Sequence, residues 1–235
     1  MLNSEARTPT SKAPSVTYAC DPLKASCGCS AENVILNRAR ILGGEEAVPF
    51  SWTMSVSIRL NDTDEHACGG SILSASYILT SAFCVDGVVP DGISIAAGIH
   101  NLEEDFLTLR YVQEVLIHPD WNRNDGSYRH DIALLRIFPP LSVDANGYLA
   151  RTCVPYFSSS DERQNYPRQG SNVTVVGWGA TEYGRQRTSV TLQQATVSVI
   201  DSHALICQQS LHDVKSQFCA GMPGIGKARI FTCAL

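Results

Sequence analysis

The stretch SWTMSVSIRL, residues 51–60, alternates apolar and polar side chains along most of its length. Its apolar members are Trp52, Met54, Val56, Ile58 and Leu60. Successive side chains on an extended chain point to opposite faces, so this spacing gathers the apolar set on one face. The stretch predicts a β-strand with one apolar face and one polar face.

Short apolar runs of the same kind follow it along the chain, with polar turns between them. They occupy residues 71–80, 93–99, 106–117, 131–137, 173–179 and 190–200. Many short strands with hardly a helical stretch are typical of an all-β sandwich or barrel. A polar, proline-containing crossing at residues 139–170 divides the runs into two groups. We therefore predict an all-β protein built from two β units.

Composition excludes several classes of protein. The chain has 235 residues, of which 44% are hydrophobic, and this is enough to form a globular core. The net charge of −5 comes from dispersed acids, without the clustered Lys and Arg of a nucleic-acid interface. No apolar run approaches the roughly 20 residues that span a bilayer. We expect no nucleic-acid partner and no membrane span.

The chain contains nine cysteines, which do not fall into the paired spacing of a zinc site. A disulfide framework is the better interpretation, and it favours an extracellular protein. The opening residues 1–22 lack the apolar segment of a signal peptide, which suggests that upstream sequence is missing. Residues 1–40 hold cysteines at 20, 27 and 29 and show no periodicity, so we expect an irregular leader tethered by disulfides.

Five motifs in order resemble the trypsin-like, chymotrypsin-fold serine proteases over about residues 29–227. They are RILGG (40–44), CGGSILSASYILTSAFC (68–84), HDIALLRI (130–137), VVGWGAT (175–181) and QFCAGMPGIGK (217–227). The resemblance implies a leader at 1–40 and a protease domain at 41–235. It implies two six-stranded antiparallel β-barrels, the second incomplete. The first covers about 41–140, a linker about 139–170, the second barrel about 171–227 and a divergent tail 228–235.

The chemistry of this family needs a nucleophilic serine, an imidazole base and a buried carboxylate that orients the imidazole. The resemblance places Asp131 at the carboxylate position and activation cleavage between Arg40 and Ile41. Where the family has a histidine between alanine and cysteine, this chain has Phe83. A phenyl ring cannot accept a proton, so we expect the general base to be absent.

Three histidines near the motifs are alternative candidates for the base: His66, His118 and His130. We interpret each as a surface or packing histidine. After Lys227 the family continues to a serine loop, whereas this chain reads ARIFTCAL at 228–235. We therefore expect the nucleophile and its oxyanion hole to be absent from this sequence.

The leading interpretation is a non-catalytic, secreted homologue of a trypsin-like endopeptidase that acts by binding a protein partner. One alternative is an active serine endopeptidase whose given sequence stops before the nucleophile loop. Another is a chain that makes no stable product. We expect no cofactor and no metal, because the acidic stretch at 101–106 is better explained as a solvated turn.

Further expectations concern individual side chains. The resemblance implies disulfides Cys68–Cys84, Cys207–Cys219, Cys29–Cys153 and Cys20–Cys27, with Cys233 left over. Asn61 begins an Asn-X-Thr sequence on a polar loop and is a candidate for glycosylation. Asp131 would lack its imidazole partner, and we expect Phe83 to pack over a protonated or solvated acid.

Overall fold

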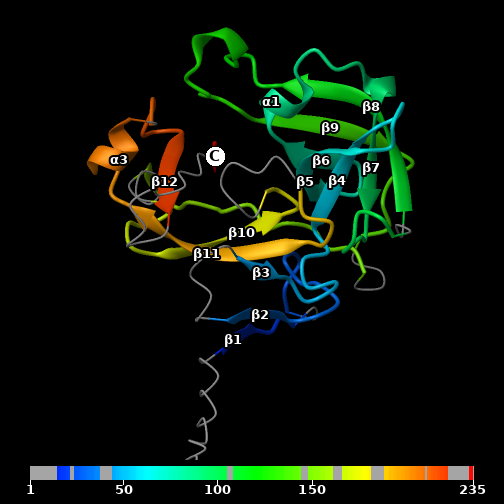
Figure 1. The fold of residues 1–235 in the computed structure, drawn as a ribbon, viewed down its shortest axis with the longest axis horizontal. Helices are drawn as coiled ribbons and strands as arrows, with labels where there is room; N and C mark the ends of the chain where they lie inside the picture. Colours follow the sequence, from blue (N-terminus) through cyan, green and yellow to red (C-terminus); the bar gives the residue numbers. More distant parts are fainter. Residues whose placement is uncertain are drawn as a thin grey trace, which may run out of the picture.

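The computed structural model describes residues 15–21, 24–37, 44–104, 108–143, 148–160, 166–180, 188–209, 211–221 and 233–234. These residues are mostly strands, with the short helices α1 (Ala82–Val85) and α3 (Leu205–Gln208) and the 3₁₀ turns η1 (Pro90–Gly92) and η2 (Arg123–Asp125). Figure 1 shows a barrel above, a second sheet crossing beneath it and a two-stranded ribbon at the bottom. No helix in these ranges is long and apolar enough to cross a membrane.

The first unit is a closed, six-stranded antiparallel barrel in the order β4-β5-β6-β9-β8-β7. Its strands are β4 (Ser55–Leu60), β5 (His66–Ser74), β6 (Tyr77–Thr80), β7 (Ile93–Ala97), β8 (Thr108–Ile117) and β9 (Ala133–Phe138). Each lies within or beside a run of apolar residues predicted above. The interior is filled by fully buried branched side chains, among them Val56, Ile72, Ile78, Ile95 and Leu135. Closure pairs every strand edge of this unit.

The polar face predicted for strand β4 is buried in the structure. Ser57 is fully buried and Arg59 is nearly so, although both belong to the polar set. Ser57 lies 2.7 Å from Nδ1 of His66, and Arg59 Nε donates to Asp64 at 2.7 Å. The ring of His66 in turn lies edge-on to Trp178 of the second unit, with ring centroids 5.5 Å apart. The second unit therefore lies close to this face, whose polar groups are satisfied within the protein.

The second unit is a five-stranded, partial barrel sheet. Strands β10 (Asn172–Gly177), β11 (Gln193–Ile200), β12 (Gln217–Gly221) and β13 (Cys233–Ala234) follow one another, and β3 (Glu45–Glu46) pairs with β11. The two units share a small apolar cluster that contains Trp178. The indole N–H of Trp178 donates to the carbonyl oxygen of His100 at 3.0 Å. The fold is thus a closed barrel joined to a partial one, as predicted.

The leader is more ordered than we expected. Strands β1 (Ser15–Tyr18) and β2 (Val34–Asn37) form an antiparallel ribbon, seen at the bottom of Figure 1. Asn37 donates through its backbone and side chain to the carboxylate of Glu45 on β3, with the backbone bond at 2.9 Å. These contacts tie the ribbon to the second sheet.

Two of the four expected disulfides are confirmed and two are wrong. Cys68–Cys84 and Cys207–Cys219 form as expected, but the leader is joined by Cys20–Cys29 and Cys27–Cys153. The Gly28 N–H donates to the carbonyl oxygen of Arg151 at 2.7 Å, which brings this part of the leader beside Cys153, and the turn at Gly28 leaves Cys27 facing it. Gly28 has φ of +78°, a left-handed conformation that suits glycine.

Candidate active site and its surroundings

Phe83 lies on α1, directly after barrel strand β6. The disulfide Cys68–Cys84 joins α1 to β5, so the position of residue 83 is fixed by the neighbouring covalent link. Ala82 and Val85 of the same turn are buried in the barrel core, while Phe83 is 50% exposed. The geometry of the turn therefore presents residue 83 outward from the barrel core.

The Asp131 carboxylate lies immediately before β9 and reaches the start of α1. Its Oδ1 accepts a hydrogen bond from the Ser81 hydroxyl at 2.6 Å and another from the backbone N–H of Phe83 at 2.7 Å. The first N–H groups of a helix have no partner within the helix, so an acceptor here satisfies a donor that would otherwise be free. Asp131 thus joins β9 to α1 through residue 83 itself.

This arrangement corrects the expectation that Asp131 would have no partner. The carboxylate accepts from two donors, and neither of them needs an imidazole. The Phe83 ring has different neighbours from those expected. Its centroid lies 5.9 Å from that of Tyr128 and 5.5 Å from Cζ of Arg123. No motif in the sequence indicated the part played by Ser81.

Arg123 connects the loop between β8 and β9 to α1. One of its guanidinium nitrogens donates to the carbonyl oxygens of Phe83 at 3.0 Å and Asp86 at 3.2 Å. Its Nε lies 3.3 Å from the carboxylate of Asp86, which also accepts from the indole of Trp121 at 3.1 Å. A cation above an aromatic ring is attracted by the electron-rich face of that ring. Phe83, Arg123 and Tyr128 together form what we call the aromatic patch.

The loop that carries Arg123 and Tyr128 is shaped by its own polar contacts. Asp125 accepts from the Ser127 N–H at 2.8 Å and from the Ser127 hydroxyl at 2.7 Å, and Arg129 Nε donates to the same hydroxyl at 3.1 Å. These hydrogen bonds from Ser127, chiefly the one from its hydroxyl, lower the pKa of Asp125. Gly126 takes a left-handed φ of +64° at the turn. The loop is therefore held in one defined shape.

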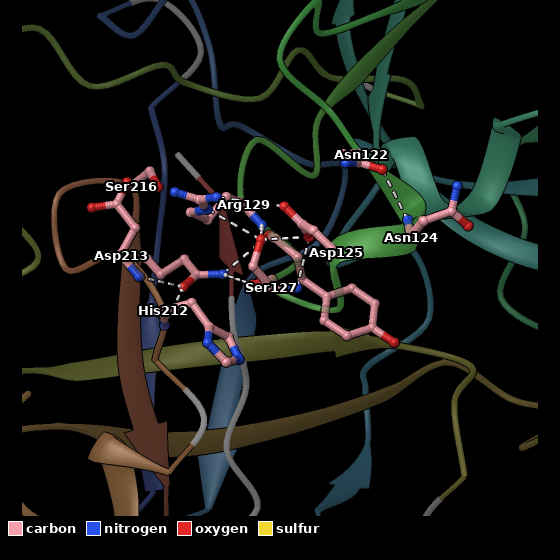
Figure 2. A network of polar contacts seen from close by, with 10 residues as sticks. Asn122, Asn124, Asp125, Ser127, Arg129, His212, Asp213 and Ser216 are labelled. Atoms are coloured by element: carbon pink, nitrogen blue, oxygen red, sulfur yellow. Dashed lines mark hydrogen bonds and ion pairs between the residues drawn. The ribbon is translucent and has the colours of Figure 1, made fainter.

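Gln217 on β12 holds this loop against the second unit. Its buried amide nitrogen donates to the carbonyl oxygens of Ser127 and Tyr128, both at 3.0 Å. Its amide oxygen accepts from the backbone N–H groups of His212 at 3.0 Å and Asp213 at 3.1 Å. Figure 2 shows the loop residues Asp125 and Ser127 opposite His212 and Asp213 in this network. The aromatic patch is thus positioned by both units, which no sequence motif indicated.

None of the six histidines shares a hydrogen bond with Asp131 among the residues described here. His66 pairs with the fully buried Ser57, which no substrate can reach. Burial lowers the pKa of His66, and the positive charge of Arg59 lowers it further. His118 and His130 stack on each other with centroids 4.7 Å apart. None of these contacts involves Asp131.

Several predicted sites fall in other parts of the chain. Arg40 and Ile41, the expected cleavage residues, lie outside the described residues, as do residues 222–232, where the family motif ends and the tail begins. Asn61 is exposed after β4, and its amide donates to the carbonyl oxygen of Asp91 at 2.7 Å. Its glycosylation stays a prediction.

Comparison with known proteins gives a consistent result. A protein-family model described as Trypsin matches residues 41–231. The chymotrypsin-like elastase family member 1 of Canis lupus familiaris is 32% identical over 206 residues, which cover 84% of this chain and 75% of that protein. The protein of the same name from Homo sapiens is also 32% identical over 206 residues, with the same two shares.

A relative with a different name matches over a shorter part. Coagulation factor IX of Cavia porcellus is 33% identical over 186 residues, which cover 77% of this chain and 61% of that protein. The family match spans most of the chain and includes both units of the fold. With the closed barrel, the partial second barrel and the motif order already described, the chain belongs to the trypsin-like, chymotrypsin-fold serine protease family.

Proposed function

We propose that this chain is a non-catalytic member of its family that binds a protein segment at the aromatic patch. One observation carries the proposal: the position from which an imidazole would reach Asp131 holds a phenyl ring, and Asp131 accepts the backbone N–H of that same residue. General base catalysis needs a group that accepts a proton within hydrogen-bond reach of the nucleophile. Phe83 offers no such group.

The composition of the aromatic patch supports binding. Phe83 is 50% exposed and Tyr128 is 48% exposed, and Arg123 lies against the Phe83 ring. Tyrosine and arginine are enriched among the residues that carry most of the energy of protein interfaces. Hydrogen bonds also hold the patch in place, from Arg123 to the carbonyl oxygen of Phe83 and from Gln217 to that of Tyr128. A preformed surface loses little conformational entropy on binding.

The proposed partner is an extended protein segment, by analogy with the substrates of proteases. The proposed location is extracellular, which the four disulfides support. The competing function is serine-type endopeptidase activity. The retained Asp131 and the RILGG sequence at 40–44 favour it.

Chemistry separates the two functions. The full chain, cut after Arg40 by an added protease that is then removed, should neither react with a fluorophosphonate probe nor hydrolyse Arg or Lys amides. A covalent adduct or multiple turnovers would reject the non-catalytic proposal.

Binding is tested with a displayed library of random peptides. Peptides selected on the parent chain should bind Phe83→Ser and Tyr128→Ser at least about tenfold more weakly, because each variant removes a hot-spot side chain. Tyr156→Ser is the matched control, since Tyr156 is 92% exposed and lies outside the patch. Equal loss in the control, or no loss in the patch variants, would reject the patch as the binding surface.

A further inference from the structure

His118 and His130 face each other where the β8–β9 hairpin ends. The paired strands finish at Ile117 and Ala133, and one more bond, from the His118 N–H to the carbonyl oxygen of Ile132, extends the ladder at 3.1 Å. The Ile132 N–H donates to the carbonyl oxygen of His130 at 2.8 Å. The two imidazoles are therefore fixed by backbone bonds on both sides, although they are twelve residues apart in the sequence.

A carboxylate completes the group. One ligand atom from each of His118, Asp120 and His130 lies within 4.8 Å of the others. Asp120 is exposed, and its side chain has no hydrogen bond or ion pair with the described parts of the chain. Its backbone N–H donates to Nδ1 of His118 at 3.1 Å, which holds residue 120 close to the first imidazole. The carboxylate is thus free to turn toward both rings.

We propose that His118, Asp120 and His130 form a binding site for a divalent transition-metal ion of the zinc type. Two imidazole nitrogens and one carboxylate oxygen are a donor set that suits Zn²⁺, whereas Ca²⁺ and Mg²⁺ prefer oxygen donors alone. Three protein ligands leave a further position for water or for a group from another molecule. The site does not depend on whether the chain hydrolyses peptides.

Metal binding requires a small rearrangement. Ligand distances of about 2.0–2.2 Å to zinc bring the donor atoms closer together than they are in the metal-free arrangement. The rings are now nearly parallel, with an interplanar angle of 11°, and must tilt so that their in-plane lone pairs converge. Nδ1 of His118 accepts the Asp120 backbone N–H and so carries no proton, and a metal bound at this atom would replace that hydrogen bond. A metal bound at Nε2 would instead require Nε2 to lose its proton. The bound ion would hold together the two ends of the loop that carries Arg123 and Tyr128.

The charge around the site also suits a cation. The Asp120 carboxylate supplies a negative charge to the group of ligand atoms.

The test is titration of the full, disulfide-bonded chain with Zn²⁺ alone at about pH 7.5, above the ordinary histidine pKa of about 6.5. The chain carries Cys233→Ser, so that the ninth cysteine cannot bind zinc. Calorimetry should show one bound ion, and His118→Ala or His130→Ala should weaken binding by more than about tenfold, since even outer-shell partners are worth about 10–100-fold. Asp120→Asn should weaken it by a smaller factor.

His203→Ala is the matched control, because His203 lies beside a carboxylate, with Nδ1 3.0 Å from Asp201, but away from the proposed site. It should leave zinc affinity unchanged. Unchanged affinity in a His118→Ala, His130→Ala double variant would overturn the proposal, as would an equal loss in the control.

A second measurement avoids variants that fail to fold. In the protein that keeps both histidines, the imidazole NMR signals of His118 and His130 should shift when zinc is added, because the two stacked rings must separate to bind the ion. Shifts confined to other histidines would overturn the proposal.

Discussion

Replacement of the Asp131 carboxylate tests whether this side chain holds α1 to β9. Asp131→Ala removes the acceptor of two hydrogen bonds, 2.6 Å from the Ser81 hydroxyl and 2.7 Å from the Phe83 N–H. Hydrogen bonds to charged groups contribute about 1.5–3 kcal/mol each, and the half-buried position of Asp131 favours the lower end. We expect the free energy of unfolding to fall by about 3 kcal/mol.

Thermal unfolding of the disulfide-intact chain measures this loss. For a domain of this size, 1 kcal/mol shifts Tm by about 2–4 °C, so Asp131→Ala should unfold about 6–12 °C below the parent. Asp131→Asn retains an oxygen acceptor but loses the charge, so its loss should be about half as large. The two variants together separate the hydrogen bonds from the charge.

A double-mutant cycle identifies the partner. Ser81→Ala removes one of the two donors, and its effect should shrink by at least about 1 kcal/mol when Asp131 is already alanine. The Phe83 amide NMR signal should also shift in Asp131→Ala, because that N–H loses its acceptor. Unfolding of Asp131→Ala within about 1 °C of the parent would refute this role of Asp131, because the change is too small for the loss of two charge-assisted hydrogen bonds.

Three further predictions concern the pH dependence of stability, the contact between Gln217 and the β8–β9 loop, and the packing of the barrel. Burial and the charge of Arg59 lower the pKa of His66 in the folded chain, so the unfolded chain takes up the proton at higher pH. The free energy of unfolding of the parent should therefore fall as the pH falls below about 6.5. His66→Gln should lose less stability over the same pH range, measured by unfolding at several pH values. Gln217→Ala should lower the free energy of unfolding, measured in urea, by about 2–3 kcal/mol, because the buried backbone groups that Gln217 contacts lose their hydrogen-bond partner. The amide NMR signals of His212 and Asp213, whose N–H groups lose their acceptor, should also shift. Gly70→Ala should cost about 1–3 kcal/mol because its Cβ would lie 2.8 Å from a methyl carbon of Ile78. Gly69→Ala, with nothing within 4 Å of its Cβ, should stay within about 0.5 kcal/mol of the parent.

The barrel could be predicted because its strands carry a physical signal in the chain itself. Alternation across residues 51–60 correctly placed Val56 and Ile58 in the core, although β4 begins only at Ser55. This alternation predicts which side chains lie on each face of the strand, but not which other part of the protein packs against that face. Burial of Ser57 depends on the contact of His66 with Trp178, which lies more than a hundred residues away.

The leader shows where sequence information ends. Strands of four residues, such as β1 and β2, are too short to show a periodicity that distinguishes them from coil. The disulfide partners of Cys27 and Cys29 could not be separated by spacing, since the two residues differ by only two positions. Gly28 lies between them and bonds to Arg151, and only the folded leader shows that Cys27 is the residue that faces Cys153 at this contact.

The candidate site was predictable in its residues but not in its contacts. The resemblance indicated Phe83 and Asp131, and the structure brings them together through a backbone N–H rather than through a ring. Arg123 and Gln217 were missed because each acts on carbonyl oxygens, which carry no side-chain signature in a sequence. The same limit applies to His118 and His130, whose proximity depends on the register of the β8–β9 hairpin.

The contacts of Asp131 also explain how a carboxylate can stay in place without an imidazole. A half-buried carboxylate with no hydrogen-bond donor would lower the stability of the fold, so replacing it with an uncharged residue would raise stability. Here the same oxygen accepts from Ser81 and from the N–H of residue 83, and a backbone N–H is present whichever of histidine or phenylalanine occupies that position. The acid therefore has a structural role that is independent of the side chain at residue 83. It follows that a retained Asp131 is weak evidence for catalysis, and that the side chain of residue 83 is the stronger evidence on whether a base is present.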